Sequence, residues 1–156
     1  MTHIRPATSA DIDEICQLGD EVNALHHDNA PSLFAAPGDP HRHAAHWLST
    51  LDKTAAATFV AELDTAMVGF VTVLVVTESH SLLQPLRFAR IGTVGVSASQ
   101  RGQGTGKALM ACAQTWAKAQ GATEIRLTVA AFNEGAVRLY QELGYEVRTH
   151  QFFKAL

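Results

Sequence analysis

Residues 96–107 read Val-Ser-Ala-Ser-Gln-Arg-Gly-Gln-Gly-Thr-Gly-Lys, and this stretch decides which fold the chain can adopt. Gly102, Gly104 and Gly106 remove side chains at alternate positions directly before a helical pattern. Successive backbone N–H groups and the positive end of the helix dipole can therefore converge on an anion. The sequence predicts a loop that holds a diphosphate group between a strand and a helix.

Spacing excludes two other phosphate-binding loops that carry similar glycines. A P-loop requires a glycine five residues before its Gly-Lys pair and a hydroxyl residue after it, but these positions hold Arg101 and Ala108. The dinucleotide fingerprint G-x-G-x-x-G requires its third glycine at position 107, which is Lys107. On these residues alone, a plain glycine-rich turn stays open as the alternative.

A second distinctive segment spans residues 133–145 and reads Asn-Glu-Gly-Ala-Val-Arg-Leu-Tyr-Gln-Glu-Leu-Gly-Tyr. Asn133 can cap a helix while its amide contacts a ligand, and Tyr140 follows two turns later on the same helical face. A lone tyrosine would be interpreted as a core residue. Together, the two side chains are expected to point at one cleft.

The two segments resemble the signatures [QR]-x-x-G-x-[GA] and N-x-x-A-x-x-L-Y-x-x-x-G-[FY] of the GNAT superfamily of N-acetyltransferases. The residues that match their fixed positions are Arg101, Gly104, Gly106, Asn133, Ala136, Leu139, Tyr140, Gly144 and Tyr145. The resemblance covers essentially the whole chain. It implies an α+β fold in which helices flank a mixed, mostly antiparallel sheet.

The periodicity of apolar residues predicts the order of elements. Helices are expected from a cap at Thr8 or Ser9 to about residue 27, and over residues 41–51, 107–120 and 133–143. Strands are expected over residues 4–7, 58–63, 66–76, 87–96 and 124–129, with closing strands within 145–153 and a hairpin turn at Asp64-Thr65. Residues 28–40 are rich in proline and glycine and predict a loop. We expect one domain over residues 1–156.

Composition narrows the class of protein further. Charged residues make up 17% and the formal net charge is −3, so no basic field exists to attract nucleic acid or anionic lipid. Cys16 and Cys112 show no disulfide framework, and the spacing of His41, His43 and His46 suits no familiar metal site. No signal peptide or membrane span is evident. We expect a cytoplasmic protein without a metal and without nucleic-acid or membrane partners.

The resemblance implies that acetyl-CoA is the cosubstrate. Backbone near residues 94–96 would bind the pantetheine arm and the thioester carbonyl, residues 101–107 the pyrophosphate, and Tyr140 would protonate the departing thiolate. The cofactor contacts expected are Val94, Gly95, Val96, Arg101, Gly102, Gln103, Gly104, Thr105, Gly106, Lys107, Asn133, Ala136 and Tyr140. Gly92 and Gly95 are unusual inside a strand, which a bulge or the close approach of a ligand would explain.

For the acceptor side of the reaction, the sequence contains no comparable motif. Many relatives carry a glutamate near the start of the strand before the glycine loop, but residues 91–94 contain no carboxylate. Glu78 and His80 are the candidate bases, and His26 or His27 are alternatives. The expected acceptor is a primary amine of a small molecule or peptide.

Two further expectations concern the whole protein. The missing carboxylate favours, as an alternative function, a catalytically silent acetyl-CoA-binding sensor. Relatives in this family often pair, so a homodimer is possible.

Overall fold

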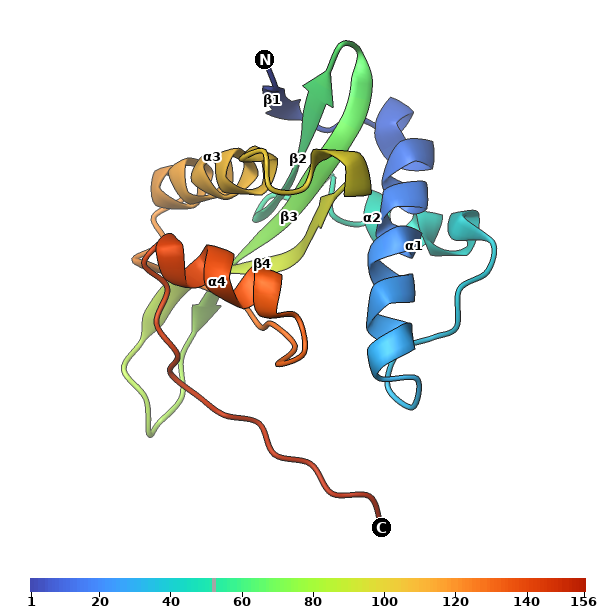
Figure 1. Ribbon diagram of the computed structural model, residues 1–156. Coiled ribbons are helices and arrows are strands. Elements are labelled where there is room, and N and C mark those ends of the chain that lie inside the picture. Colours follow the sequence, from blue (N-terminus) through green and yellow to red (C-terminus); the bar gives the residue numbers. More distant parts are fainter. Residues whose placement is uncertain (52) are drawn as a thin grey trace.

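A five-stranded sheet forms the centre of the molecule, which a computed structural model describes over residues 1–51 and 53–156 (Figure 1). Its strands follow the chain in the order β1 (His3–Pro6), β2 (Ala56–Leu63), β3 (Ala66–Glu78), β4 (Leu86–Val96) and β5 (Glu124–Arg126). The first four strands are antiparallel to their neighbours, and β4 and β5 are parallel. This mixed, mostly antiparallel sheet confirms the predicted α+β class.

One face of the sheet is covered by α1 (Ile12–Asn29), which follows a 3₁₀ turn η1 (Ser9–Asp11). Apolar residues at helical spacing put one face of α1 in the core, where it packs with Val60 and Phe70 of the sheet. The buried residues of this helix are Ile12, Ile15, Cys16 and Leu18. The predicted amphipathic helix is therefore confirmed, and it runs two residues past its predicted end.

The second predicted helix, residues 41–51, forms only a 3₁₀ turn η2 (Pro40–His43) and a short α2 (Ala44–Leu48). Trp47 of α2 is 8% exposed, and its ring centroid lies 5.3 Å from that of Phe70. Gly19 of α1 makes room for it, because a Cβ there would lie 2.6 Å from the Trp47 ring. This segment therefore anchors itself in the core through Trp47.

The other face of the sheet is covered by α3 (Thr105–Ala119), and α4 (Glu134–Glu142) follows β5. Leu109, Met110, Ala113 and Ala117 of α3 are buried against strands β2, β3 and β4. Figure 1 shows α3 and α4 in front of the sheet and α1 to its side. The helix predicted over 107–120 begins two residues earlier because Gly104 serves as its N-cap.

A partly buried ion pair ties β1 to the start of α1. The Arg5 guanidinium donates to both carboxylate oxygens of Asp11 at 2.9 and 2.8 Å, and Thr8 N–H donates to the same carboxylate at 2.7 Å. The hydrogen bonds from Arg5 are the main reason that the pKa of Asp11 falls to about 2.

The turn that joins β2 to β3 forms at Asp64 and Thr65, as predicted. Both residues have positive φ, as a tight hairpin requires.

Two predictions about the C-terminal part are wrong. The strand predicted over 124–129 is only three residues long, and no strand forms within 145–153. After Tyr145 the chain leaves the body as an extended tail (Figure 1). A strand needs a partner for its backbone groups, and within the described residues only β4 pairs with β5.

Candidate functional site

The parallel pair β4–β5 opens into a fork. The two strands pair only over Phe88 to Arg90 of β4 and Glu124 to Arg126 of β5. From Ile91 to Val96, β4 pairs with β3 alone, so its second edge has no strand partner in the described part of the chain. An open strand edge offers backbone donors and acceptors to an extended ligand.

A β-bulge lies at the start of this open half of β4. The register shifts between Val71 and Val73 of β3, which places Gly92 and Thr93 opposite the single residue Thr72. Thr93 N–H donates to Thr72 Oγ1 at 2.9 Å. The bulge predicted from the strand glycines is therefore confirmed, and a bulge bends a strand away from regular pairing.

The strand glycines themselves are explained by packing. A Cβ at Gly92 would lie 2.6 Å from Thr72 Oγ1, and a Cβ at Gly95 would lie 2.7 Å from Phe70 Cε1. Both glycines therefore make room for side chains of β3, and the close approach of a ligand to them stays a prediction. The backbone of Val94, Gly95 and Val96 still lies along the open edge.

The glycine loop adopts a conformation that only glycine takes easily. Gly102 and Gly104 have φ of 74° and 88°, and no heavy atom lies within 4 Å of a Cβ built on either residue. The first α3 amide with a backbone acceptor is that of Ala108, which donates to Gly104 O at 3.0 Å. The N–H groups of residues 105–107 have no acceptor among the described residues. The loop thus offers open space and unpaired donors at one helix N-terminus.

Side chains around the loop add positive charge and hold its shape. Arg101 and Lys107 are exposed, and Arg101 Nε donates to Val96 O at 3.2 Å. Gln103 Nε2 donates to Ser99 O at 3.0 Å. The Thr105 side chain is 3% exposed and faces Gly69 of the sheet, so only its backbone is available to a ligand. These features fit a pyrophosphate group.

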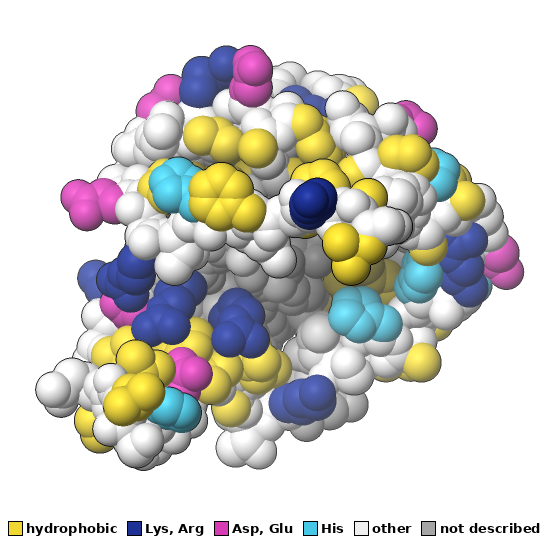
Figure 2. All heavy atoms as spheres, turned by 90° about the horizontal axis from the view of Figure 1, so that it is seen from below, with side chains coloured by type: hydrophobic (Ala, Val, Ile, Leu, Met, Phe, Trp, Pro, Cys, Tyr) yellow, Lys and Arg dark blue, Asp and Glu magenta, His cyan; other side chains and the backbone are white. Residues whose placement is uncertain are grey.

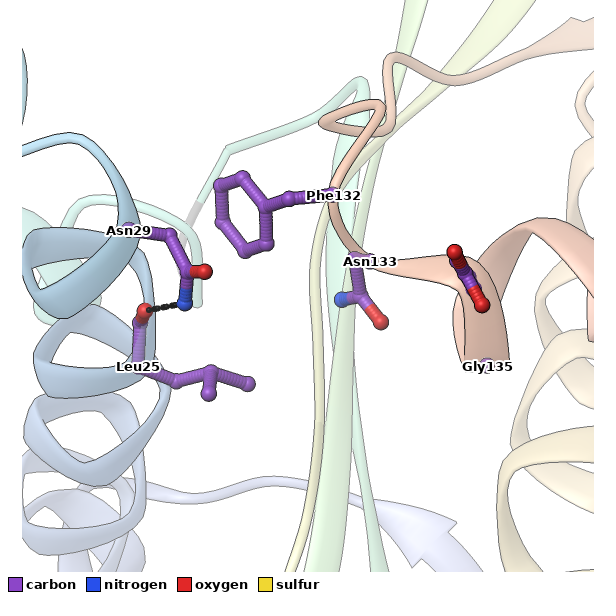
Figure 3. Close-up of a pocket in the computed structure, with 6 residues that line it drawn as sticks. Leu25, Asn29, Phe132, Asn133 and Gly135 are labelled. Atoms are coloured by element: carbon purple, nitrogen blue, oxygen red, sulfur yellow. Dashed lines mark hydrogen bonds between the residues drawn. The ribbon is translucent and has the colours of Figure 1, made fainter.

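The second segment lies across a hollow from α1. Asn133 Oδ1 accepts from Ala136 N at 3.2 Å and caps α4, as the sequence predicts. The hollow has a volume of about 250 Å³. Its lining residues are Leu25, Asn29, Phe132, Asn133, Glu134 and Gly135. Figure 3 shows the Phe132 ring projecting toward α1 from the loop that precedes α4.

Tyr140 is half-buried on α4. Its ring centroid lies 5.8 Å from that of Tyr145, whose hydroxyl accepts from Gln114 Nε2 at 3.2 Å. Burial raises the pKa of Tyr140, and the neighbouring Tyr145 raises it further. The Tyr140 phenol therefore carries its proton at neutral pH, as a proton donor must.

His26 links α1 to the loop before α4. Its ring lies 4.8 Å from Phe34 and 5.5 Å from Phe132, measured between centroids, and its Nδ1 is 2.8 Å from Val22 O. A carbonyl oxygen only accepts, so Nδ1 carries the proton and Nε2 of the neutral ring has a free lone pair. Val22, one turn earlier on α1, lies against Gly95 of β4. His26 therefore lies beside Phe132, a lining residue of the hollow, and one helical turn from the residue that packs on Gly95.

The predicted bases Glu78 and His80 lie at the opposite end of β4. Glu78 pairs across the sheet with Leu86, six residues and about 20 Å of strand from the bulge at Gly92. Its carboxylate is 3.8 Å from Arg126 Nη1, while His80 Nδ1 accepts from Leu82 N at 3.1 Å in the following loop. The structure does not bring these two side chains to the glycine loop.

Sequence reasoning missed the apolar and basic residues around the fork. Phe132 directly precedes Asn133, and that adjacency was the available signal. Arg90 and Arg126 end the paired part of β4 and β5, and only the pairing register reveals that they are neighbours.

Residues 1–51 and 53–156 contain no cluster of three or more His, Cys, Asp or Glu side chains arranged to hold a metal ion. In the same residues, no helix combines the length and apolar character needed to cross a membrane.

Comparison with known proteins identifies the class. The sequence model of the Acetyltransferase (GNAT) family matches residues 22–145, and the chain belongs to this family. N-acetyltransferase family 8 member 2 of Rattus norvegicus is 35% identical over 94 residues, which cover 60% of this chain and 40% of the rat protein. Mycothiol acetyltransferase of Thermobispora bispora is 32% identical over 87 residues, covering 56% and 29% respectively. These matches span less than half the length of either relative.

Solved structures share the fold over the full chain. A mutant of the BH1408 protein from Bacillus halodurans superposes with a TM-score of 0.93 at 20% identity, covering 99% of each chain. The aminoglycoside N-acetyltransferase AAC(6')-Iy, in complex with the bisubstrate analogue CoA-S-monomethyl-acetylneamine, gives 0.79 at 20% identity, covering 100% and 98%. A putative acetyl transferase from Pyrococcus furiosus gives 0.76 at 27% identity over all of both chains. The predicted GNAT fold is confirmed.

Proposed function

We propose that this protein transfers an acetyl group from acetyl-CoA to a primary amine of a small molecule or peptide, within a ternary complex. The observation that carries the proposal is the glycine loop, whose unpaired amides lie next to the open half of β4. In the proposal the loop residues 101–107 hold the pyrophosphate, and the backbone of residues 94–96 binds the pantetheine arm. Asn133 and Ala136 at the start of α4 contact the cofactor from the other side.

The chemistry needs one proton donor and one proton acceptor. The neutral amine attacks the thioester carbonyl carbon, a C–N bond forms, and the C–S bond breaks. Tyr140 supplies a proton to the departing thiolate, and the attacking nitrogen loses its proton to a base. Solvent then returns a proton to Tyr140 and removes one from the base, so the enzyme is unchanged.

Among the candidate bases, the geometry favours His26. Its Nε2 has no hydrogen-bond partner among residues 1–51 and 53–156, and the ring is half-buried beside Phe132. Glu78 is already close to Arg126, and His80 is exposed in a loop. Those two remain candidates only if a water chain connects them to the amine. His27 makes the same kind of contact, with Nδ1 at 2.8 Å from Phe34 O, but among the described residues the ring contact with Phe132 belongs to His26.

Thiol release from acetyl-CoA, measured against a panel of amines, amino acids, polyamines, aminoglycosides and peptide N-termini, tests the proposal. The expected result is thiol release with at least one amine, together with a product that is about 42 Da heavier than that amine by mass spectrometry. A silent acetyl-CoA sensor is the second candidate, because no carboxylate occupies residues 91–94. It predicts thermal stabilisation by acetyl-CoA without thiol release for any amine.

The cytoplasmic location of the protein stays a prediction.

A further inference from the structure

The α1-side face of the fork carries a concentration of arginines. Arg90 pairs in register with Leu74 and Arg126, and Phe88 pairs with Val76 and Glu124. Paired residues in neighbouring strands share a face of the sheet. Leu74 and Val76 are separated from Phe70 by even numbers of residues, so they lie on the same face as Phe70, which packs under α1. Arg90, Arg126 and Phe88 therefore lie on the side of the sheet where α1 and the hollow are found.

The two guanidinium groups lie over one aromatic ring. Arg126 Cζ is 3.8 Å and Arg90 Cζ is 5.6 Å from the centroid of Phe88, which is fully buried. Such stacking orients a guanidinium and leaves its N–H groups free to point outward. Figure 2 shows Lys and Arg side chains gathered beside a hollow on this underside of the molecule.

Charges near the fork leave Arg90 without a counterion. Glu124 accepts from Arg126 and also from both terminal nitrogens of Arg148, at 2.8 and 3.0 Å. Glu78 is close to Arg126. Within the described residues, no carboxylate forms an ion pair with Arg90.

We infer that Arg90, supported by Arg126, binds an anionic group of the acceptor, so the acceptor is an amine that also carries a carboxylate. This inference rests on the proposed function. The guanidinium fork matches a carboxylate in shape and charge. The same positive charge disfavours polycationic acceptors such as aminoglycosides at this end of the cleft.

Matched acceptors test this inference. Initial rates of thiol release are compared for α-amino acids and for the same amino acids as carboxamides, whose neutral amide replaces the carboxylate. In wild type we expect kcat/KM at least about tenfold higher for the acids. Arg90→Gln should raise KM for the acids about tenfold, with little change for the carboxamides or in acetyl-CoA affinity. Arg87→Gln, on the opposite face of β4 beside Thr77, is the control and should keep the preference.

The outcomes separate the two levels of the proposal. Equal use of acids and carboxamides, or an equal loss for both in Arg90→Gln, overturns the assignment of Arg90 while the acetyltransferase function stands. Acetyl-CoA binding without thiol release from any amine overturns the proposed function itself.

Discussion

The two halves of the candidate site are built in different ways. The cofactor half consists of β4, the glycine loop and the start of α3, which are continuous over residues 86–119. The acceptor half combines the end of α1, the loop before α4 and the fork residues of β4 and β5, which are far apart in the sequence. A contiguous site needs only local geometry, whereas an assembled one depends on how distant elements pack. The first can be recognised as a motif, and the second cannot.

The largest expected effect comes from the cofactor half. Gly104→Val places a β-branched side chain at φ +88° in the space left open for the pyrophosphate. We expect at least a hundredfold loss of acetyl-CoA affinity in calorimetry. Gly144→Val, at a glycine with a similar φ of +85° and open space around it but outside the loop, is the control and should bind normally. Undiminished affinity of Gly104→Val would remove the loop from the cofactor site.

The next effect tests whether α4 joins the two halves. Tyr140→Phe keeps the ring and removes the proton donor, so kcat should fall about 10²-fold while the dissociation constant of acetyl-CoA is unchanged. Tyr145→Phe is the matched control, because its hydroxyl contacts Gln114 and not the proposed reaction. Equal kcat values for wild type and Tyr140→Phe would exclude Tyr140 as the acid.

A smaller effect is expected in the acceptor half. His26→Gln removes the proposed base, and kcat should fall by about ten- to a hundredfold, with acetyl-CoA affinity retained. His80→Gln, in the loop between β3 and β4, should stay within about threefold of wild type. Glu78→Gln should also lose less kcat than His26→Gln, because Glu78 lies beside Arg126 rather than at the bulge. If either variant loses more kcat than His26→Gln, the base lies at that end of β4.

The smallest effect on catalysis is expected away from both halves. Asp11→Asn breaks the pair with Arg5, and it should lower the free energy of unfolding at pH 7 by about 2 kcal/mol. Because the pKa of Asp11 is lowered to about 2, its stabilisation is present above pH 4 and is lost as the pH falls toward 2. Denaturant unfolding of both proteins at several pH values measures this difference. Their acetyl-CoA affinities should be equal.

Much of the fold was predictable because local patterns and tertiary packing agree. The hairpin at Asp64-Thr65, the amphipathic helices and the strand before the glycine loop form close to their expected bounds. The failures lie at the C-terminus. Residues 145–153 have the composition of a strand, but strand formation also requires a free edge within reach. Sequence periodicity contains no information on whether that edge belongs to the same chain.

The candidate site divides in the same way. Loop residues 101–107 and the Asn133 cap could be assigned from sequence because glycine conformations and helix caps depend on neighbouring residues. Trp47 is buried over Gly19 of α1, a contact that the sequence pattern did not reveal. Gly95 makes room for Phe70, a packing reason for the glycine that the sequence did not reveal. In both cases the deciding contact comes from a residue at least 25 positions away.

By itself, the sequence determined the family, the loop suited to a pyrophosphate and the order of the elements, since each depends on short-range backbone geometry or on apolar periodicity. Tertiary structure alone decided which side chains surround the fork. Parallel pairing of β4 with β5 makes Arg90 and Arg126 neighbours, and the packing of α1 brings His26 to Phe132. The physical reason is that charge and proton transfer act over a few ångströms in space, whatever the separation along the chain.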